Sequence, residues 1–377
     1  MATPTLAAQA TSVTPVAAHS LWVGTRKGLF VVCRSGAGWQ IGEPHFPGEP
    51  VSQLLIDPHD GVWYAALRLG HFGVKLWKSV DAGGQWQAIA APAFPPKPDH
   101  GFWKDDPTPW SVDMVWSLEA GPGILWAGCL PAGLFSSTDG GASWQLAENL
   151  WLRPERKEWL GGGYDHAGIH SILVDPRDPQ HLTVAISCGG VWQSRDGGAS
   201  WRNTSEGLEA GYMPPERRAD PNIQDVHRVV HCAVQPDVLW GQHHCGIWRS
   251  TNGGEFWDAV AAPQPSGFGF AVAAHPLDPA RAWFVPAHSD AQRMPVGGRL
   301  VVNETRDGGV TFASHGAGLP QQGAFHLMYR HALVASQDGQ TLAMGSTTGG
   351  LWVSEDAGVH WQCLSRDLPP IATLRLD

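Results

Sequence analysis

Short apolar runs alternate with tight polar turns along nearly the whole chain. Residues 54–56, 62–65 and 74–77 are three such runs in succession, rich in Val, Leu, Ile, Trp and Tyr. Runs this short, bounded by Gly, Pro, Asp and Ser, are typical of β-strands and leave no room for long amphipathic helices. The pattern predicts an all-β protein.

One polar turn recurs along the chain with nearly the same sequence. Its clearest copy is Ser194-Arg195-Asp196-Gly197-Gly198-Ala199-Ser200-Trp201, and further copies occupy residues 79–86, 137–144, 250–257, 305–312 and 354–361. Asp and Gly-Gly supply the side-chain hydrogen bonds and the positive φ angles that a tight hairpin needs. A shortened copy at residues 33–39 keeps the turn and the tryptophan but lacks the aspartate. A period of about 50 residues built from short strands predicts a β-propeller.

The first and last segments of the chain are expected to form one blade together. Residues 21–25, 28–32 and 39–41 are expected to be the second, third and fourth strands of a blade, and no innermost strand precedes them. The last residues, 371–376, form an apolar strand with no blade of their own. We therefore predict a single seven-bladed propeller over residues 21–377, closed by the C-terminal strand, with residues 1–20 as a disordered tail.

The repeated turn resembles the Asp-box, or BNR repeat, of sialidases, some endoglucanases and related bacterial propellers. Residues 22–30, 226–230, 242–250 and 267–270 also resemble a bacterial group of single-ring Asp-box proteins labelled sialidase-like or glycosyl hydrolase. The resemblance implies the seven-bladed ring with Asp-box turns. The chain lacks the Arg-Ile-Pro segment of sialidases and has only four tyrosines, which argues against sialidase activity.

Composition narrows the possible partners. The formal net charge is −10 and no basic run exists, which argues against nucleic acid and anionic membranes. No stretch of the chain is apolar for long enough to span a bilayer. The six cysteines show no C-x-x-C pairing and several lie in expected core strands, so free thiols in a cytoplasmic protein are expected.

The long connections are all expected on one face of the ring, the top, where such loops usually carry function. Histidines gather there, and those at strand starts and second-to-third-strand turns can reach the central channel. A divalent transition metal, Zn or else Fe or Cu, is predicted with the ligands His170, His227, His244 and His288. The alternatives are that these residues are metal-free polar or general-base groups, or purely structural. His231, His275 and His331 are expected to be structural.

Arginines and carboxylates make up the other candidate groups. Arginines around the channel mouth can grip a carboxylate or phosphate, although loop arginines are commonly just solvated. The candidate catalytic residues are Asp165, Asp225 and Arg293, with Asp113 as a further carboxylate, and the candidate substrate-binding residues are Arg26, Arg68, Tyr164, His166 and His243.

Three functions remain open from the sequence. The first is a metal-dependent enzyme, by default a hydrolase, acting on a small polar or anionic substrate at the top of the channel. An oxidative reaction is an option if the metal is Fe or Cu. The second is a metal-free glycoside hydrolase or lyase that uses the carboxylates. The third is a non-catalytic propeller that binds a glycan or a protein.

Overall fold

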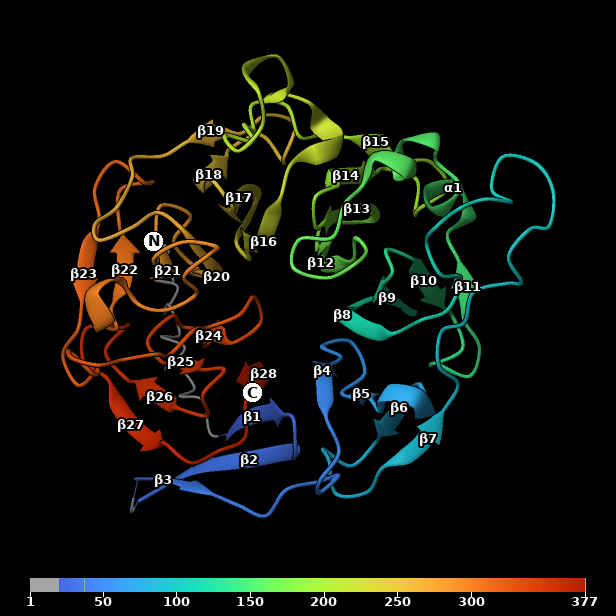
Figure 1. Cartoon of the computed structure of the whole chain (residues 1–377). Helices are drawn as coiled ribbons and strands as arrows, with labels where there is room; N and C mark the ends of the chain where they lie inside the picture. The colour runs from blue at the N-terminus through green and yellow to red at the C-terminus, as the bar shows by residue number, and fades with distance from the viewer. Residues whose placement is uncertain (1–19, 37, 377) are drawn as a thin grey trace, which may run out of the picture.

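Seven four-stranded antiparallel sheets are arranged around a central channel (Figure 1). The structure is a computed structural model, and it describes residues 20–36 and 38–376. The predicted all-β, seven-bladed propeller is confirmed. The predicted tail lies outside the described residues apart from Ser20, which begins the first strand.

Each blade contains four strands, ordered from the channel outward. The first three blades are β28 (Ile371–Leu376), β1 (Ser20–Thr25), β2 (Gly28–Ser35) and β3 (Gly38–Ile41); β4 (Val51–Ile56), β5 (Trp63–Arg68), β6 (Val74–Ser79) and β7 (Gln87–Ile89); and β8 (Met114–Gly121), β9 (Ile124–Leu130), β10 (Leu134–Ser137) and β11 (Gln145–Leu146). The fourth and fifth are β12 (Ile169–Asp175), β13 (Asp178–Ile186), β14 (Gly190–Ser194) and β15 (Arg202–Asn203); and β16 (Val226–Cys232), β17 (Gln235–His243), β18 (Gly246–Ser250) and β19 (Asp258–Ala259). The last two are β20 (Gly269–Ala274), β21 (Ala282–Pro286), β22 (Val302–Thr305) and β23 (Ala313–His315); and β24 (Leu333–Ala335), β25 (Leu342–Gly345), β26 (Leu351–Ser354) and β27 (Gln362–Ser365).

The C-terminal strand closes the ring, as predicted. β28 pairs antiparallel with β1, with Leu374 opposite Val23 and Leu376 opposite Leu21. The Arg26 backbone N–H donates to the Pro370 carbonyl oxygen over 3.0 Å. This pairing gives β1 an inner partner and completes the four-stranded first blade.

The repeated turn has the same pattern of hydrogen bonds in each of its six full-length copies. In the clearest one, the Ser194 hydroxyl donates to Asp196 Oδ1 over 2.8 Å and accepts from the Gly198 N–H over 2.7 Å. Asp196 Oδ1 also accepts from the Ser200 N–H over 2.8 Å. Gly198 has φ +89° and lies against Trp126 of the preceding blade. The turn therefore fastens a hairpin and fixes the distance between two blades.

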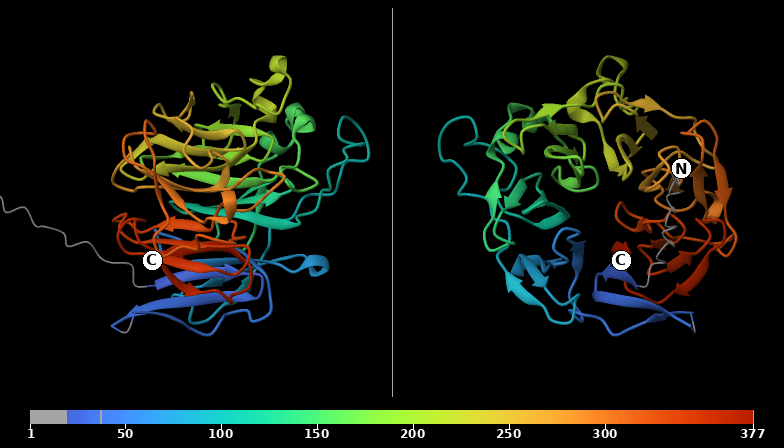
Figure 2. Two further views of the ribbon diagram at one scale, coloured as in Figure 1. Left: turned by 60° about the vertical axis from the view of Figure 1, so that its left-hand side comes forward. Right: turned by 180° about the vertical axis from the view of Figure 1, so that it is seen from behind.

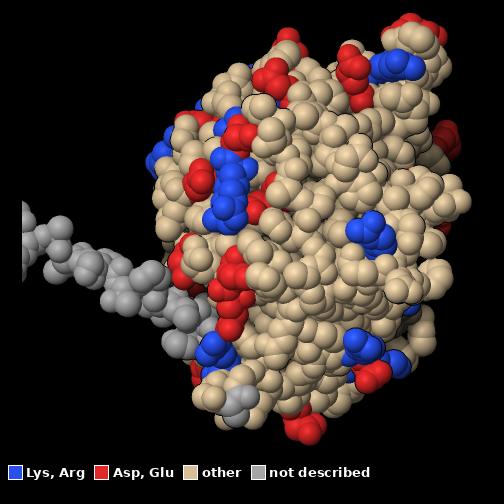
Figure 3. Space-filling view, turned by 90° about the vertical axis from the view of Figure 1, so that its left-hand side faces the viewer, with Lys and Arg blue, Asp and Glu red and all other residues tan. Residues whose placement is uncertain are grey.

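The hydrophobic core is divided into clusters that lie between neighbouring blades. One cluster joins Trp22 and Leu29 of the first blade to Val51 and Trp63 of the second. Ion pairs bridge neighbouring blades on the outside, as between Arg195 and Glu255 at 2.8 Å. Figure 3 shows acidic and basic side chains interspersed on one outer face.

The few helical segments are short and lie in the connections. They are η1 (Gly70–Phe72), α1 (Glu148–Trp151), η2 (Pro154–Glu158), η3 (Pro215–Arg217), η4 (Pro221–Ile223) and η5 (Val296–Gly298). The connection between β7 and β8 extends beyond the rim of the ring in both views of Figure 2. None of the helices in the described ranges has the length and apolar character needed to cross a membrane.

Ring closure by β28 predicts that a substitution at a buried position of this strand lowers the free energy of unfolding more than one at a partly buried position. Leu374 is fully buried in a cluster with Leu21, Val23 and Leu351. Leu374→Ala is expected to lower the free energy of unfolding by about 2–5 kcal/mol, because it leaves a cavity at the closing seam. Leu376→Ala, two residues along the same strand and only partly buried, is the control. Equal losses in urea unfolding for the two variants would contradict this account of closure.

The repeated turns predict acid sensitivity. Hydrogen bonds from Ser143, Ser200 and Thr311 hold the pKa of Asp139, Asp196 and Asp307, respectively, at about 2. Because these values lie below the unfolded value of about 4, the stabilisation is fully present above pH 4 and is lost as the pH falls toward 2.

Asp196→Asn tests this directly, since Asn252 already fills the equivalent place in another copy and accepts from the Phe256 N–H over 3.1 Å. The variant is expected to fold and to lose less of its stability between pH 4 and pH 2 than the unsubstituted protein does. Thermal melts over this pH range measure the difference, and an unchanged pH dependence would count against the turn carboxylate as its source.

Candidate functional site

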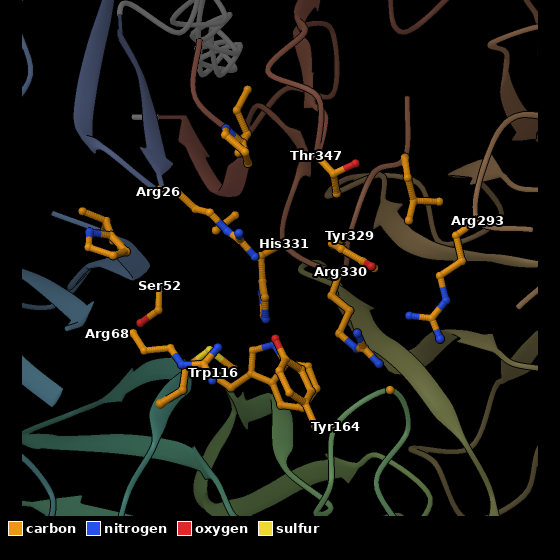
Figure 4. Close-up of a pocket in the computed structure, with 18 of the residues that line it drawn as sticks. Arg26, Ser52, Arg68, Trp116, Tyr164, Arg293, Tyr329, Arg330, His331 and Thr347 are labelled. Carbon is orange, nitrogen blue, oxygen red and sulfur yellow. The ribbon is translucent and has the colours of Figure 1, made fainter. Parts of the chain in front are cut away.

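A pocket of about 510 Å³ lies at the end of the channel where the innermost strands begin. Its wall contains Ser52 from the start of β4, Met114 and Trp116 from β8, and Ile371 from the start of β28. Arg26, in the turn between β1 and β2, and Arg68, at the end of β5, reach the same space. Figure 4 shows these side chains arriving from different blades. This is the face on which the sequence predicted the functional loops.

The pocket is positively charged although the whole chain is acidic. Four arginines line it: Arg26, Arg68, Arg293 and Arg330. Among the described residues that form its wall there is no Asp or Glu. Arg68 is paired behind the wall with Asp113 at 2.6 Å, and Arg293 is paired with Asp290. Against a net charge of −10, this local field attracts anions into the channel mouth.

Arg330 and His331 are the most unusual groups in the wall. Each side chain belongs to a residue that is only 5% exposed. Within the described part of the chain, Arg330 Nε and Nη2 and both ring nitrogens of His331 have no hydrogen-bond partner. Burial lowers the pKa of His331 well below its usual value, and the charges of Arg228 and Arg375 add to the effect, so His331 is neutral at pH 7. Buried polar groups without partners are costly and mark a place where a ligand can supply the missing bonds.

Aromatic side chains complete the wall. The Arg330 guanidinium lies 4.6 Å from the centre of the Trp116 ring. Tyr164 meets the same indole edge-on, with ring centres 5.1 Å apart, and Tyr329 lines the opposite part of the pocket. The wall therefore combines cationic, aromatic and hydroxyl groups, the combination that binds a polar ring carrying a negative charge.

A second group of titratable residues lies directly behind this wall. Asp225, His227 and His244 bring one carboxylate oxygen and two ring nitrogens within 4.8 Å of one another. Burial alone would raise the pKa of Asp225, but His227 and His244 hold it well below its usual range. A Cβ on Gly162, which lines the pocket, would lie 2.8 Å from Asp225 Oδ1. Only a glycine backbone therefore separates this group from the pocket.

The structure places the predicted site residues in several different surroundings. Of the candidate residues, Arg26, Arg68, Tyr164 and Arg293 line it. Asp165 and His166 do not; they border a different cavity, of about 450 Å³, beside Arg156 and Trp159. His243 is fully buried and accepts a hydrogen bond from the Cys245 N–H over 3.0 Å.

The four predicted metal ligands do not all come together at one site. His227 and His244 come together, joined by Asp225, which the sequence had suggested as a catalytic residue. His170 is outside this group: it is fully buried, contacts the Ser171 hydroxyl at 3.0 Å and packs against Trp116. His288 is exposed, and its nearest polar partner is the Ser289 hydroxyl at 3.4 Å.

Four important residues of the wall were not identified from the sequence: Trp116, Tyr329, Arg330 and His331. His331, which was expected to be structural, lines the pocket. The available signal was that the segment stands directly before β24 (Leu333–Ala335), the innermost strand of its blade. That strand has only three residues, so the apolar pattern does not mark its start clearly.

Comparison with known proteins finds distant relatives that are named xyloglucanases. No family model matches the chain. Two relatives named xyloglucanase, from Hypocrea jecorina and Paenibacillus sp, are 26% identical over 152 residues and 25% identical over 215 residues. These matches cover 37% and 51% of this chain but only 18% and 19% of the relatives, so the chain spans about a fifth of their length.

Solved structures agree on the fold. An ancestral GH74 enzyme superposes with a TM-score of 0.58 at 16% identity, covering 95% of this chain and 40% of the other. YCF48 from Cyanidioschyzon merolae superposes with a TM-score of 0.53 at 14% identity, covering 91% of this chain and 95% of the other. At this level of identity the likeness shows the propeller fold alone. The chain is thus a seven-bladed propeller with distant similarity to proteins named xyloglucanases.

Because Nε and Nη2 of Arg330 have no hydrogen-bond partner among the described residues, replacing this arginine is expected to cost no stability. Arg330→Met is expected to leave the free energy of unfolding unchanged or to raise it by about 1 kcal/mol, because methionine has no buried charge to satisfy. Arg156→Met is the matched control: Arg156 is equally buried but donates to Asp106 and to the Trp151 carbonyl oxygen, each over 2.6 Å.

Removing Arg156 leaves Asp106 buried and unpaired, so a loss of about 3 kcal/mol or more is expected. Urea unfolding of both variants provides the comparison. A large loss of stability in Arg330→Met would mean that this residue supports the fold rather than a ligand.

Proposed function

We propose that the protein is a carbohydrate-active enzyme that binds an acidic sugar in the channel-mouth pocket and cleaves the glycosidic bond next to it. The observation that carries the proposal is the lining of the pocket by four arginines, one of them buried with unpartnered nitrogens. The distant relatives named xyloglucanases support a glycan as the substrate class.

The arginines are suited to a carboxylate. A guanidinium group presents paired N–H donors that match the two oxygens of a carboxylate, and such bonds are strong where water is excluded. Arg330 supplies the buried donors, while Arg26 and Arg68 approach from the neighbouring first and second blades. A pocket of 510 Å³ lies within the range of roughly 300–1,000 Å³ found for small-ligand sites. Tyr164, which is 39% exposed, offers a ring on which a sugar can rest.

The lining residues support bond cleavage by elimination. Arginines that neutralise the sugar carboxylate acidify the C–H bond beside it. The neutral ring of His331, which lines the same pocket, accepts that proton. The electron pair forms a carbon–carbon double bond as the bond to the leaving oxygen breaks. A phenol, Tyr164 or Tyr329, returns a proton to the leaving oxygen.

Hydrolysis is supported less well by the same wall. Glycoside hydrolases use two carboxyl groups that face each other across the sugar. In the described wall of the pocket no carboxylate is present. Nearby carboxylates lie behind it, with Asp113 paired to Arg68, Asp290 paired to Arg293 and Asp225 held by two histidines. Elimination is therefore the reaction that we propose.

The test is cleavage of two matched sets of oligosaccharides, one containing uronic acids and one neutral, such as fragments of xyloglucan. Cleavage of uronate substrates is expected, with a conjugated double bond in the product that ultraviolet absorbance detects. Arg26→Ala is expected to raise KM at least tenfold through the lost ion pair, and His331→Ala to reduce kcat by a factor on the order of 100 or more. Lys27→Ala is the control, because Lys27 is exposed and does not line the pocket.

The outcomes separate the alternatives. New reducing ends without the double bond would show hydrolysis and refute elimination. Saturable binding of uronates with no turnover would show a non-catalytic glycan-binding propeller. Preference for the neutral set would remove the acidic sugar from the proposal.

A further inference from the structure

Asp225, His227 and His244 converge from two elements of the fifth blade. Asp225 directly precedes β16 and His227 is the second residue of this strand, and their side chains reach the same point. His244 lies in the turn between β17 and β18, and its backbone N–H donates to the Asp225 carbonyl oxygen over 2.9 Å. The main chain thus holds the three side chains against one another.

The hydrogen bonds of His227 fix which of its nitrogens faces the carboxylate. Nδ1 lies 2.6 Å from the carbonyl oxygen of Gly269. A carbonyl oxygen only accepts, so Nδ1 must donate its proton there. In a neutral ring, Nε2 then carries a lone pair, and it lies 3.4 Å from Asp225 Oδ2. Two acceptors face each other, an arrangement that requires a cation or a proton between them.

The separation between His227 and Asp225 fits a metal ion better than a hydrogen bond, and the separation between His244 and Asp225 fits either. His227 Nε2 is 3.4 Å and His244 Nδ1 is 3.2 Å from Asp225 Oδ2. Good N–H···O bonds are about 2.7–3.2 Å long. Ligand atoms at about 2.1 Å from a tetrahedral metal ion are about 3.4 Å apart. Asp225 Oδ1 also has no hydrogen-bond partner among the described residues, although its residue is 5% exposed.

We propose that Asp225, His227 and His244 form a binding site for one divalent transition metal ion. Two imidazoles and one carboxylate are a ligand set used by proteins for Zn²⁺ and for Fe²⁺. The carbonyl oxygen of Gly269 is the outer partner that orients His227, the role that backbone carbonyls play around metal-bound histidines. Three protein ligands leave a coordination position for water or substrate.

Ions reach this site from the outside of the ring. The His244 side chain is 25% exposed. It borders a cavity of about 300 Å³ whose wall also includes Cys245 and Phe268. On its other side the site touches the channel-mouth pocket at Gly162, whose missing side chain leaves Asp225 Oδ1 close to the pocket wall. The site is therefore accessible and adjacent to the pocket that we assign to the substrate.

This inference does not depend on the proposed sugar chemistry, and its test uses no substrate. Protein freed of any polyhistidine tag is stripped with a chelator and titrated with Zn²⁺ by calorimetry and with Co²⁺ by visible absorption. We expect one ion per chain and a rise in melting temperature on adding Zn²⁺. His244→Ala is expected to weaken binding at least tenfold and to abolish the rise in melting temperature.

His288→Ala is the control, since His288 is an exposed histidine of the neighbouring blade that lies outside the group; its affinity should equal that of the unsubstituted protein. Because Asp225 and His227 are buried, circular dichroism must show that each variant is folded before its binding is compared. Failure of the folded native chain to bind Zn²⁺ or Co²⁺ would overturn the site. Undiminished affinity in His244→Ala, or equal losses in both variants, would also overturn it.

Discussion

The pairing of β28 with β1 is the constraint on which the rest of the structure depends. A propeller has a defined channel only when its first and last blades are joined, and here residues from both ends of the chain build one sheet. The same pairing sets part of the pocket wall, because Arg26 follows β1 and Ile371 begins β28. The repeated turns and the clusters between blades keep the remaining sheets at a fixed spacing. The geometry of the channel mouth is thus a consequence of closure.

At the channel mouth, buried polar groups lack the hydrogen-bond partners that a stable protein interior normally provides. Arg330 and His331 are buried with nitrogens that no described residue satisfies, whereas Arg156, equally buried, has its partners. Unsatisfied buried groups cost stability, and proteins retain them chiefly where function needs them. The low-dielectric wall around Arg330 strengthens its attraction for an anion, and the metal site proposed beside it would place a second cationic centre within reach of the same ligand.

The fold could be predicted from the sequence because its structural unit is repeated along the chain. The site depends on which side chains from different blades meet, and the sequence does not show this. Each turn such as Ser194–Trp201 encodes its own hairpin, so the number of blades and the closing strand followed directly. Arg26 and Arg68 were found because they lie in turns whose face the repeat defines. The place of His331 in the pocket wall was not predicted, because the short β24 does not show clearly where its blade begins. His170 and His227 both lie near innermost strand starts, yet only His227 meets Asp225 and His244. Which loop approaches each strand cannot be predicted from the local sequence.

The central claim is that the channel mouth recognises a carboxylate on a sugar. Calorimetric titration of the native protein with two ligands of the same ring, a methyl glucuronide and the corresponding methyl glucoside, isolates the contribution of that carboxylate. Saturable one-to-one binding of the glucuronide, weakened by salt and at least tenfold tighter than that of the glucoside, is the predicted result. Equal affinity for the two sugars, or binding of neither, would contradict the account.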